Sequence, residues 1–356
     1  MRIIKDPMSS NEFFAKFKEE MMPFIKENVE KAYKGPEVAK ARKGRIIGIV
    51  AVIAGFFFLI LAALGASFAY NSTAFGRVVL IISLIGLIAS IVVAVIFFWI
   101  YKKNKDTIKN LILRSLNEDF IYNKTFQIFG DDFNYLTREE IGALNSQGVD
   151  TNLEITKQEM YYHNVSIPSD AKIIDITPPR KLLLHNKYMV VTQNVLYRWI
   201  EGSGKNQRER NRWNSYIKVD TSILQDRQFN FTLFRGNNPL GAKVKLENDR
   251  FNKIFKLTTN NELKIRQMYT PLAMETSVSW YDKERKNVKF PEPAVSSIAS
   301  REYVMFSNIG EKGFMNLDFA FSVKSEKVFK AIVKDIYSDS FSFYYLIAFL
   351  HFSLYL

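Results

Sequence analysis

The sequence predicts an α+β protein in which an N-terminal amphipathic helix and a two-helix transmembrane hairpin precede a cytoplasmic, mostly antiparallel sheet domain with packed helices. Residues 46–69 and 78–100 are apolar and carry no Asp, Glu, Lys or Arg, and each exceeds the roughly 20 residues that cross a bilayer as a helix. After residue 170, short segments rich in β-branched and aromatic residues alternate with Pro, Gly and Asn, which is typical of strands and turns. The predicted divisions are a cytoplasmic amphipathic helix over 1–45, the hairpin over 46–100, a helical and irregular connector over 101–170, and the α+β domain over 171–356.

The N-terminal segment 9–43 is predicted as an amphipathic helix, because apolar side chains recur three and four positions apart among charged ones. Polar residues at positions 9–11 are suited to cap it, Pro23 is expected to kink it, and Gly35-Pro36 is expected to break it. The apolar stripe consists of Phe13, Phe14, Phe17, Met21, Phe24 and Ile25. Two placements are open for this stripe: packed on the cytoplasmic domain, or lying in the lipid interface with lysines toward the headgroups.

Basic residues flank the hairpin at its two outer ends. The connector 70–77 holds a single one, Arg77, so the positive-inside rule predicts a cell-membrane protein with two spans and both chain ends in the cytoplasm. The flanking cations are Lys31, Lys34, Lys40, Arg42, Lys43 and Arg45 before the spans, and Lys102, Lys103, Lys105, Lys109 and Arg114 after them. Of these, Arg42, Lys43, Arg45, Lys102 and Lys103 are the candidate headgroup contacts.

Within the spans, small residues recur four positions apart. They are Ala51 and Gly55, Ala62 and Ala66, and Gly86 and Ser90. Such spacing lets helix backbones approach closely, and it suits packing of the hairpin on itself or on a second copy.

After the hairpin, a helix is predicted to continue over 102–125, and a short helix is predicted to start at Thr137, with Glu140 at its capping-box position. Strands are predicted at 172–177, 188–200, 213–219, 228–234, 242–246, 302–308 and 313–323. Further helices are predicted around 251–255, from Thr270-Pro271 onward, and over 324–337. The apolar stretch 341–356 is expected to complete the core as a final helix or strand, with an interfacial anchor as the alternative.

A basic segment is the best candidate for a functional surface. Lys205, Arg208, Arg210 and Arg212 follow Gly202-Ser203-Gly204 and are flanked by Trp199 and Trp213, which predicts a long, exposed, basic hairpin loop. Its ligand would be anionic headgroups or RNA, and the adjacent spans together with a formal net charge of +13 favour lipid over nucleic acid. The plain alternative is a solvated loop.

Signatures of catalysis are scarce. The chain contains no cysteine, which excludes disulfides, cysteine nucleophiles and zinc–thiolate sites, and its three histidines, His163, His185 and His351, lie far apart in the sequence. No P-loop, dinucleotide fingerprint or serine-hydrolase elbow occurs, and no cofactor or metal is predicted. The densest acidic cluster is Asp131-Asp132 with Glu139-Glu140. Such carboxylates would bind a hard cation or act as acid and base, whereas the plain interpretation is a solvated loop before a helix N-terminus.

One segment resembles a known family. Residues 244–255 have the form V-x-L-E-x-x-x-F-x-x-x-F, and a Thr-Pro pair follows after a charged linker over 260–268. The residues that carry the resemblance are Leu246, Glu247, Phe251, Phe255, Thr270 and Pro271. Together with the order of helix, two spans and α+β domain, this segment resembles the bacterial family catalogued as domain of unknown function 3137. The resemblance implies a membrane-tethered bacterial protein without an established activity, and it implies no catalytic residues.

The leading hypothesis is therefore a non-enzymatic, membrane-anchored cytoplasmic domain that binds a protein partner, the anionic membrane surface, or both. Its expected partners are membrane lipid and either another protein or a second copy of the chain. The alternative is a membrane-bound hydrolase or transferase with an unrecognised carboxylate site, in which acids such as Asp131 and Asp132 would line a pocket with other polar groups.

Overall fold

The computed structural model describes residues 7–70, 74–130, 133–147, 151–163, 167–222, 230–234, 242–298, 303–310 and 313–355. The chain forms two compact units. The hairpin unit comprises residues 24–117 and 319–331, and the sheet unit comprises residues 1–23, 118–318 and 332–356.

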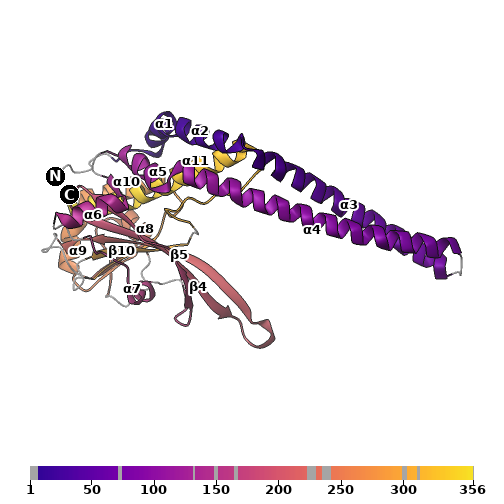
Figure 1. Ribbon diagram of the computed structural model, residues 1–356. Coiled ribbons are helices and arrows are strands. Elements are labelled where there is room, and N and C mark those ends of the chain that lie inside the picture. Colours follow the sequence, from indigo (N-terminus) through magenta and orange to yellow (C-terminus); the bar gives the residue numbers. More distant parts are fainter. Residues whose placement is uncertain are drawn as a thin grey trace. The chain divides into compact units, whose positions relative to one another are not determined.

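The hairpin unit is dominated by two long helices, α3 (Pro36–Tyr70) and α4 (Ala74–Leu116), which run antiparallel (Figure 1). Both are long and apolar enough to cross a membrane, and only 11% and 17% of their most apolar windows are buried. A core helix of a soluble protein would bury most of that surface, so this exposure suits lipid contact. The helices also extend into polar sequence on either side of the predicted spans.

The two helices approach so closely that glycine is required at their contacts. A Cβ added at Gly65 would lie 2.8 Å from the backbone nitrogen of Leu80, and one at Gly44 would lie 3.0 Å from the carbonyl oxygen of Phe97. The predicted small-residue pattern serves the same contact at Gly55, whose added Cβ would meet the Ser90 hydroxyl at 3.2 Å. Small residues thus pack the hairpin on itself.

The hairpin unit also contains most of α2 (Met22–Tyr33) and the segment 319–331. Phe321 stacks on Tyr33, with 6.4 Å between the ring centroids, and meets Tyr101 edge-on at 6.3 Å. The predicted strand over 313–323 is wrong: its described residues form turns and extended chain outside the sheet. Its aromatic residues, which suggested a strand, instead pack against helices.

The sheet unit is built on an antiparallel sheet with ten described strands in the order β1-β3-β4-β5-β10-β9-β6-β8-β7, with β2 paired to β4. The strands are β1 (Phe133–Leu136), β2 (Lys172–Ile176), β3 (Arg180–Leu184), β4 (Tyr188–Glu201), β5 (Arg208–Asp220), β6 (Phe231–Leu233), β7 (Ala242–Val244), β8 (Leu257–Thr259), β9 (Ala294–Ile298) and β10 (Tyr303–Ile309). The α+β class with an antiparallel sheet is therefore confirmed. The stretch 118–170, predicted as a connector, supplies β1 to this sheet by pairing with β3.

The helices of the sheet unit are α1 (Ser10–Glu20), α5 (Glu118–Gln127), α6 (Arg138–Ser146), α7 (Lys157–Tyr162), α8 (Asp249–Ile254), α9 (Glu262–Met268), α10 (Pro271–Glu284) and most of α11 (Ser325–Leu350), which continues into the π-helical turn η4 (His351–Tyr355). Six of them, α1, α6, α7, α8, α9 and α10, begin after a Ser, Thr or Asn whose side chain caps them. Thr137 and Glu140 form the predicted capping box of α6. Thr270 caps α10 with Pro271 at its first turn, as predicted. The stretch 260–268, predicted as a charged linker, instead contains α9, which Asn261 caps.

The N-terminal and C-terminal aromatic residues share one core. Phe13 of α1 is fully buried and stacks on Phe129, with 4.3 Å between centroids, and Phe129 stacks on Tyr344 of α11 at 4.3 Å. The α1 part of the predicted stripe therefore packs on protein at Phe13 and Phe17, both fully buried. The expectation that the C-terminal stretch completes the core is confirmed over its described side chains. A break falls at Met21, and Pro23, where a kink was expected, is tolerated in the first turn of α2. The expected break at Gly35-Pro36 is confirmed, because α2 ends at Tyr33 and α3 begins at Pro36.

Candidate functional site

A collar of cations surrounds the hairpin where its apolar section ends. Because Gly44 of α3 lies against the backbone of Phe97 and Tyr101 of α4, residues 42–45 and 101–103 are at the same level along the helix pair. The predicted headgroup contacts Arg42, Lys43, Arg45, Lys102 and Lys103 are all exposed at this level. Lys103 lies 5.5 Å from the ring centroid of Trp99, which is itself exposed. A tryptophan beside lysines is typical of a helix at a membrane–water interface.

A two-stranded ribbon forms the second cationic surface. Strands β4 and β5 pair continuously from Val190↔Val219 to Glu201↔Arg208. Their distal part extends beyond β2, whose pairing with β4 ends at Lys172↔Arg198, and beyond β10, whose pairing with β5 ends at Ile309↔Ser215 (Figure 1). We call residues 198–212 the basic ribbon. The prediction of a loop over 205–212 is wrong, because β5 begins at Arg208 and the turn is confined to the residues around the 3-10 helix Gly204–Asn206.

The predicted cations of the basic ribbon have different surroundings. Arg210 is paired with Glu201 at 2.6 Å, and the guanidinium of Arg212 lies against Gly310. In the part of the chain that the structure describes, Lys205 and Arg208 are exposed and form no ion pair. The ribbon carries five cations against two carboxylates, and Ile200 near its tip is 62% exposed. It therefore presents net positive charge, and the strand register places Arg208, Arg210 and Arg212 on the face opposite to Ile200.

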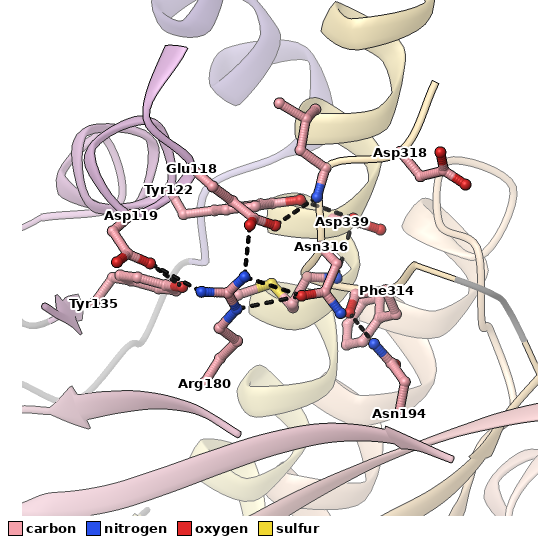
Figure 2. Close-up of polar contacts among 12 residues, drawn as sticks. Glu118, Asp119, Tyr122, Tyr135, Arg180, Asn194, Phe314, Asn316, Asp318 and Asp339 are labelled. Carbon is pink, nitrogen blue, oxygen red and sulfur yellow. Dashed lines mark hydrogen bonds and ion pairs between the residues drawn. The ribbon is translucent and has the colours of Figure 1, made fainter. Parts of the chain in front are cut away.

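A third group of charges lies inside the sheet unit. At its centre, Arg180 of β3 points toward Glu118 and Asp119 at the start of α5 (Figure 2). Arg180 Nη2 donates to Glu118 Oε2 at 2.5 Å, and Nη1 donates to Asp119 Oδ1 at 3.0 Å. The hydroxyl of Tyr135 donates to the same Asp119 oxygen at 3.1 Å. Arg180 is thus fixed by two carboxylates from one helix start.

The second half of this group belongs to α11. Asp339, fully buried, accepts from Lys289 Nζ at 2.8 Å and from the Tyr122 hydroxyl at 3.0 Å. Lys289 also contacts Asp335 at 3.3 Å. Burial raises the pKa of Asp339 to about 8, Lys289 opposes that shift, and the neighbouring carboxylate of Asp335 adds to it. We call Glu118, Asp119, Arg180, Lys289, Asp335 and Asp339 the charged clamp.

The charged clamp holds one stretch of chain, residues 314–318 (Figure 2). The backbone N–H groups of Met315, Leu317 and Asp318 donate to Asp339, Glu118 and Asp335 at 3.1, 2.6 and 3.1 Å. The side chain of Asn316 accepts from Arg180, and the carbonyl of Phe314 accepts from Asn194 of β4 at 2.9 Å. Met315 has a φ of 56°, in the left-handed region, so these bonds stabilise a backbone that the residue seldom adopts. The charged clamp therefore has a structural role: it fixes the backbone of residues 314–318.

The sequence did not identify the charged clamp. A usable signal was present at Asp339, which shares a helical face with Val328, Ile332 and Ile336, all fully buried. An acid on an apolar stripe needs buried partners. Those partners come from segments that are distant in the sequence, so only the fold brings them together.

The acidic residues singled out from the sequence lie elsewhere. Glu140 accepts from the Thr137 N–H at 2.7 Å as the cap of α6, and Glu139 is exposed in the same turn. Asp131 and Asp132 lie outside the described residues. Across the described ranges, no group of three or more His, Cys, Asp or Glu side chains is placed to hold a metal ion.

The motif that carries the family resemblance occupies a core position. Phe251 and Phe255 are buried, with 4.5 Å between their ring centroids. Leu246, five residues before Phe251, is also buried. Glu247 pairs with Arg266 of α9. These contacts explain the motif as folding information.

The chain matches no protein-family model, no curated protein and no solved structure. The resemblance to the domain of unknown function 3137 family therefore stays a prediction.

Proposed function

We propose that the chain is a membrane-anchored interaction protein whose basic ribbon binds an acidic surface, either the anionic headgroups of the membrane or an acidic protein partner. In this proposal α3 and α4 cross the cell membrane and both chain ends lie in the cytoplasm. The observation that carries the proposal is the ribbon itself: Lys205 and Arg208 are exposed at its tip and form no ion pair among the described residues, on a ribbon that extends beyond the neighbouring strands.

The hairpin supports the anchoring half of the proposal. Its exposed apolar side chains need a lipid environment, because such a surface is unfavourable in water. The collar of Arg42, Lys43, Arg45, Lys102 and Lys103 lies at one end of the apolar section, and only Arg77 lies near the other. The positive-inside rule places the end with the collar in the cytoplasm.

Electrostatics supports the binding half. Each basic side chain near an anionic leaflet contributes about 1 kcal/mol, and the effect falls off within a Debye length. Lys205 and Arg208 lie at the tip of the ribbon, so a ribbon that meets the leaflet end-on would bring both cations to it. RNA binding is less favoured, because it usually needs several aromatic side chains exposed for stacking, whereas Trp199 and Trp213 are only half exposed.

The absence of cysteine makes a direct test simple, because Ser203→Cys gives the full-length protein a unique label at the ribbon tip. An environment-sensitive dye on this cysteine should shift to the blue in nanodiscs that contain phosphatidylglycerol and not in nanodiscs of phosphatidylcholine alone. The double variant Lys205→Glu/Arg208→Glu should lose the shift. The variant Arg250→Glu/Lys253→Glu on α8 has the same change in net charge and should keep it.

The label also reports topology. In intact cells of the Ser203→Cys variant, a membrane-impermeant maleimide should leave the introduced cysteine unmodified until the membrane is permeabilised. A blue shift that survives the double charge reversal would rule out the ribbon as the lipid contact. Labelling in intact cells would rule out the proposed orientation.

A further inference from the structure

Two histidines that are far apart in the sequence meet in the sheet unit. His185 lies in the turn between β3 and β4, and His351 is the first residue of η4 after α11. Their Nε2 atoms are 3.1 Å apart, and their rings are nearly perpendicular, with an interplanar angle of 82° and centroids 4.7 Å apart. The third histidine, His163, lies elsewhere and contacts Ser296 and Tyr303.

Both members of the pair occupy unusual backbone. His185 and Asn186 have φ values of 52° and 54°, so two successive residues of the turn are left-handed. Asn, Asp and Gly usually fill such positions, and another L-residue there costs about 1 kcal/mol. His351 begins a π-helical turn, a conformation that is rare and frequent at functional sites. Irregular backbone on both sides of one contact suggests that the contact itself has a use.

We propose that His185 and His351 form a two-imidazole site for a borderline divalent cation such as Zn²⁺, Ni²⁺ or Cu²⁺, with water completing the coordination. Imidazole nitrogen is a preferred ligand of these ions. With ion–nitrogen distances of about 2.0–2.1 Å, two nitrogens separated as here subtend about 100° at the ion, between the tetrahedral and octahedral angles. The separation of the two nitrogens therefore fits a single ion bound to both.

The surroundings of the pair suit ion entry and exchange. His351 is buried, whereas His185 is partly exposed, so an ion would reach the pair from the His185 side. Binding would displace the single proton that the two facing nitrogens share and release it to water. The bound ion would fasten the β3–β4 turn to the end of α11.

The test uses full-length protein without a histidine tag, in detergent, with Cu²⁺ as a paramagnetic probe. At equimolar Cu²⁺, electron paramagnetic resonance should show hyperfine coupling to two imidazole nitrogens. His185→Asn, which tolerates the left-handed turn, should lose one of these couplings and bind Cu²⁺ about tenfold or more weakly. Lys187→Ala, in the same turn, should bind as the unchanged protein does.

A second measurement does not depend on copper. Zn²⁺ should raise the thermal unfolding temperature of the unchanged protein and of Lys187→Ala, and it should not raise that of His185→Asn. The proposal is overturned if Cu²⁺ does not bind at micromolar concentration, or if His185→Asn keeps the two-nitrogen spectrum. In either case the pair is an imidazole–imidazole hydrogen bond only.

Discussion

The charged clamp and the basic ribbon contain the same chemical groups at similar distances, in different surroundings. Arg180 lies 2.5 and 3.0 Å from two carboxylates with a side-chain exposure of 21%, whereas Arg210 lies 2.6 Å from one carboxylate with an exposure of 54%. The arginine–carboxylate distance therefore does not show whether a pair stabilises the fold or lies on a binding surface. Two properties decide whether a charged side chain supports the fold or remains available to a ligand: its burial, and the number of hydrogen-bond and ion-pair partners that it has.

The largest difference is expected when each arginine loses its charge. Arg180→Met removes the partner of two carboxylates and of Asn316, and it should lower the free energy of unfolding by about 3 kcal/mol. Arg210→Met removes one exposed pair and should cost less than about 0.5 kcal/mol. Denaturant unfolding of the full-length protein in detergent, followed by tryptophan fluorescence, measures both. If the two variants lose the same free energy of unfolding, burial does not distinguish the role of Arg180 from that of Arg210.

A smaller effect is expected from pH. The pKa of Asp339 is about 8 in the folded chain and near 3.8 when exposed, so between these values the folded state holds a proton that the unfolded state has released. The contribution of Asp339 to stability therefore falls as pH rises from about 4 to about 8 and is constant outside that window. Asp339→Asn should flatten this slope in thermal unfolding measured at about pH 5, 6.5 and 8.

The control for that experiment is Asp282→Asn, since Asp282 forms an exposed pair with Arg250. It should leave the slope unchanged. If the Asp339→Asn protein keeps the slope of the unchanged protein, the titration of Asp339 does not govern stability in this range. The absolute stability of Asp339→Asn is not the readout, because the substitution also weakens the contact with Lys289.

The two charged regions also show what the sequence could predict. The long apolar runs, the capping box at Thr137 and the Thr270-Pro271 helix start depend on neighbouring residues, and the structure has them as expected. The basic segment was predicted as a loop, because it contains glycines and many charged residues. In the structure the pairing of β4 with β5 continues past Leu196 and Trp213, so most of the segment is strand.

The clamp and the histidine pair depend on contacts across the sheet unit. Arg180 meets residues 61 and 62 positions away in the chain, and His185 meets a residue 166 positions away. No local spacing encodes such meetings, because β3 must first be placed beside α5 and the end of α11. The isolated histidines were accordingly judged too far apart for a shared site.

The smallest change sharpens the ribbon half of the comparison. Glu201→Gln removes the carboxylate that neutralises Arg210 and raises the net charge of the ribbon by one. The free energy of unfolding should change by less than about 0.5 kcal/mol, because the pair is exposed.

Binding to anionic lipid should strengthen by about 1 kcal/mol, or roughly fivefold, so the dye at position 203 should shift at a lower fraction of phosphatidylglycerol. This gain is opposite in sign to the loss expected for Lys205→Glu/Arg208→Glu. If the lipid dependence stays the same, the acidic surface does not respond to the net charge of the ribbon, and a protein partner that contacts particular side chains becomes the better candidate.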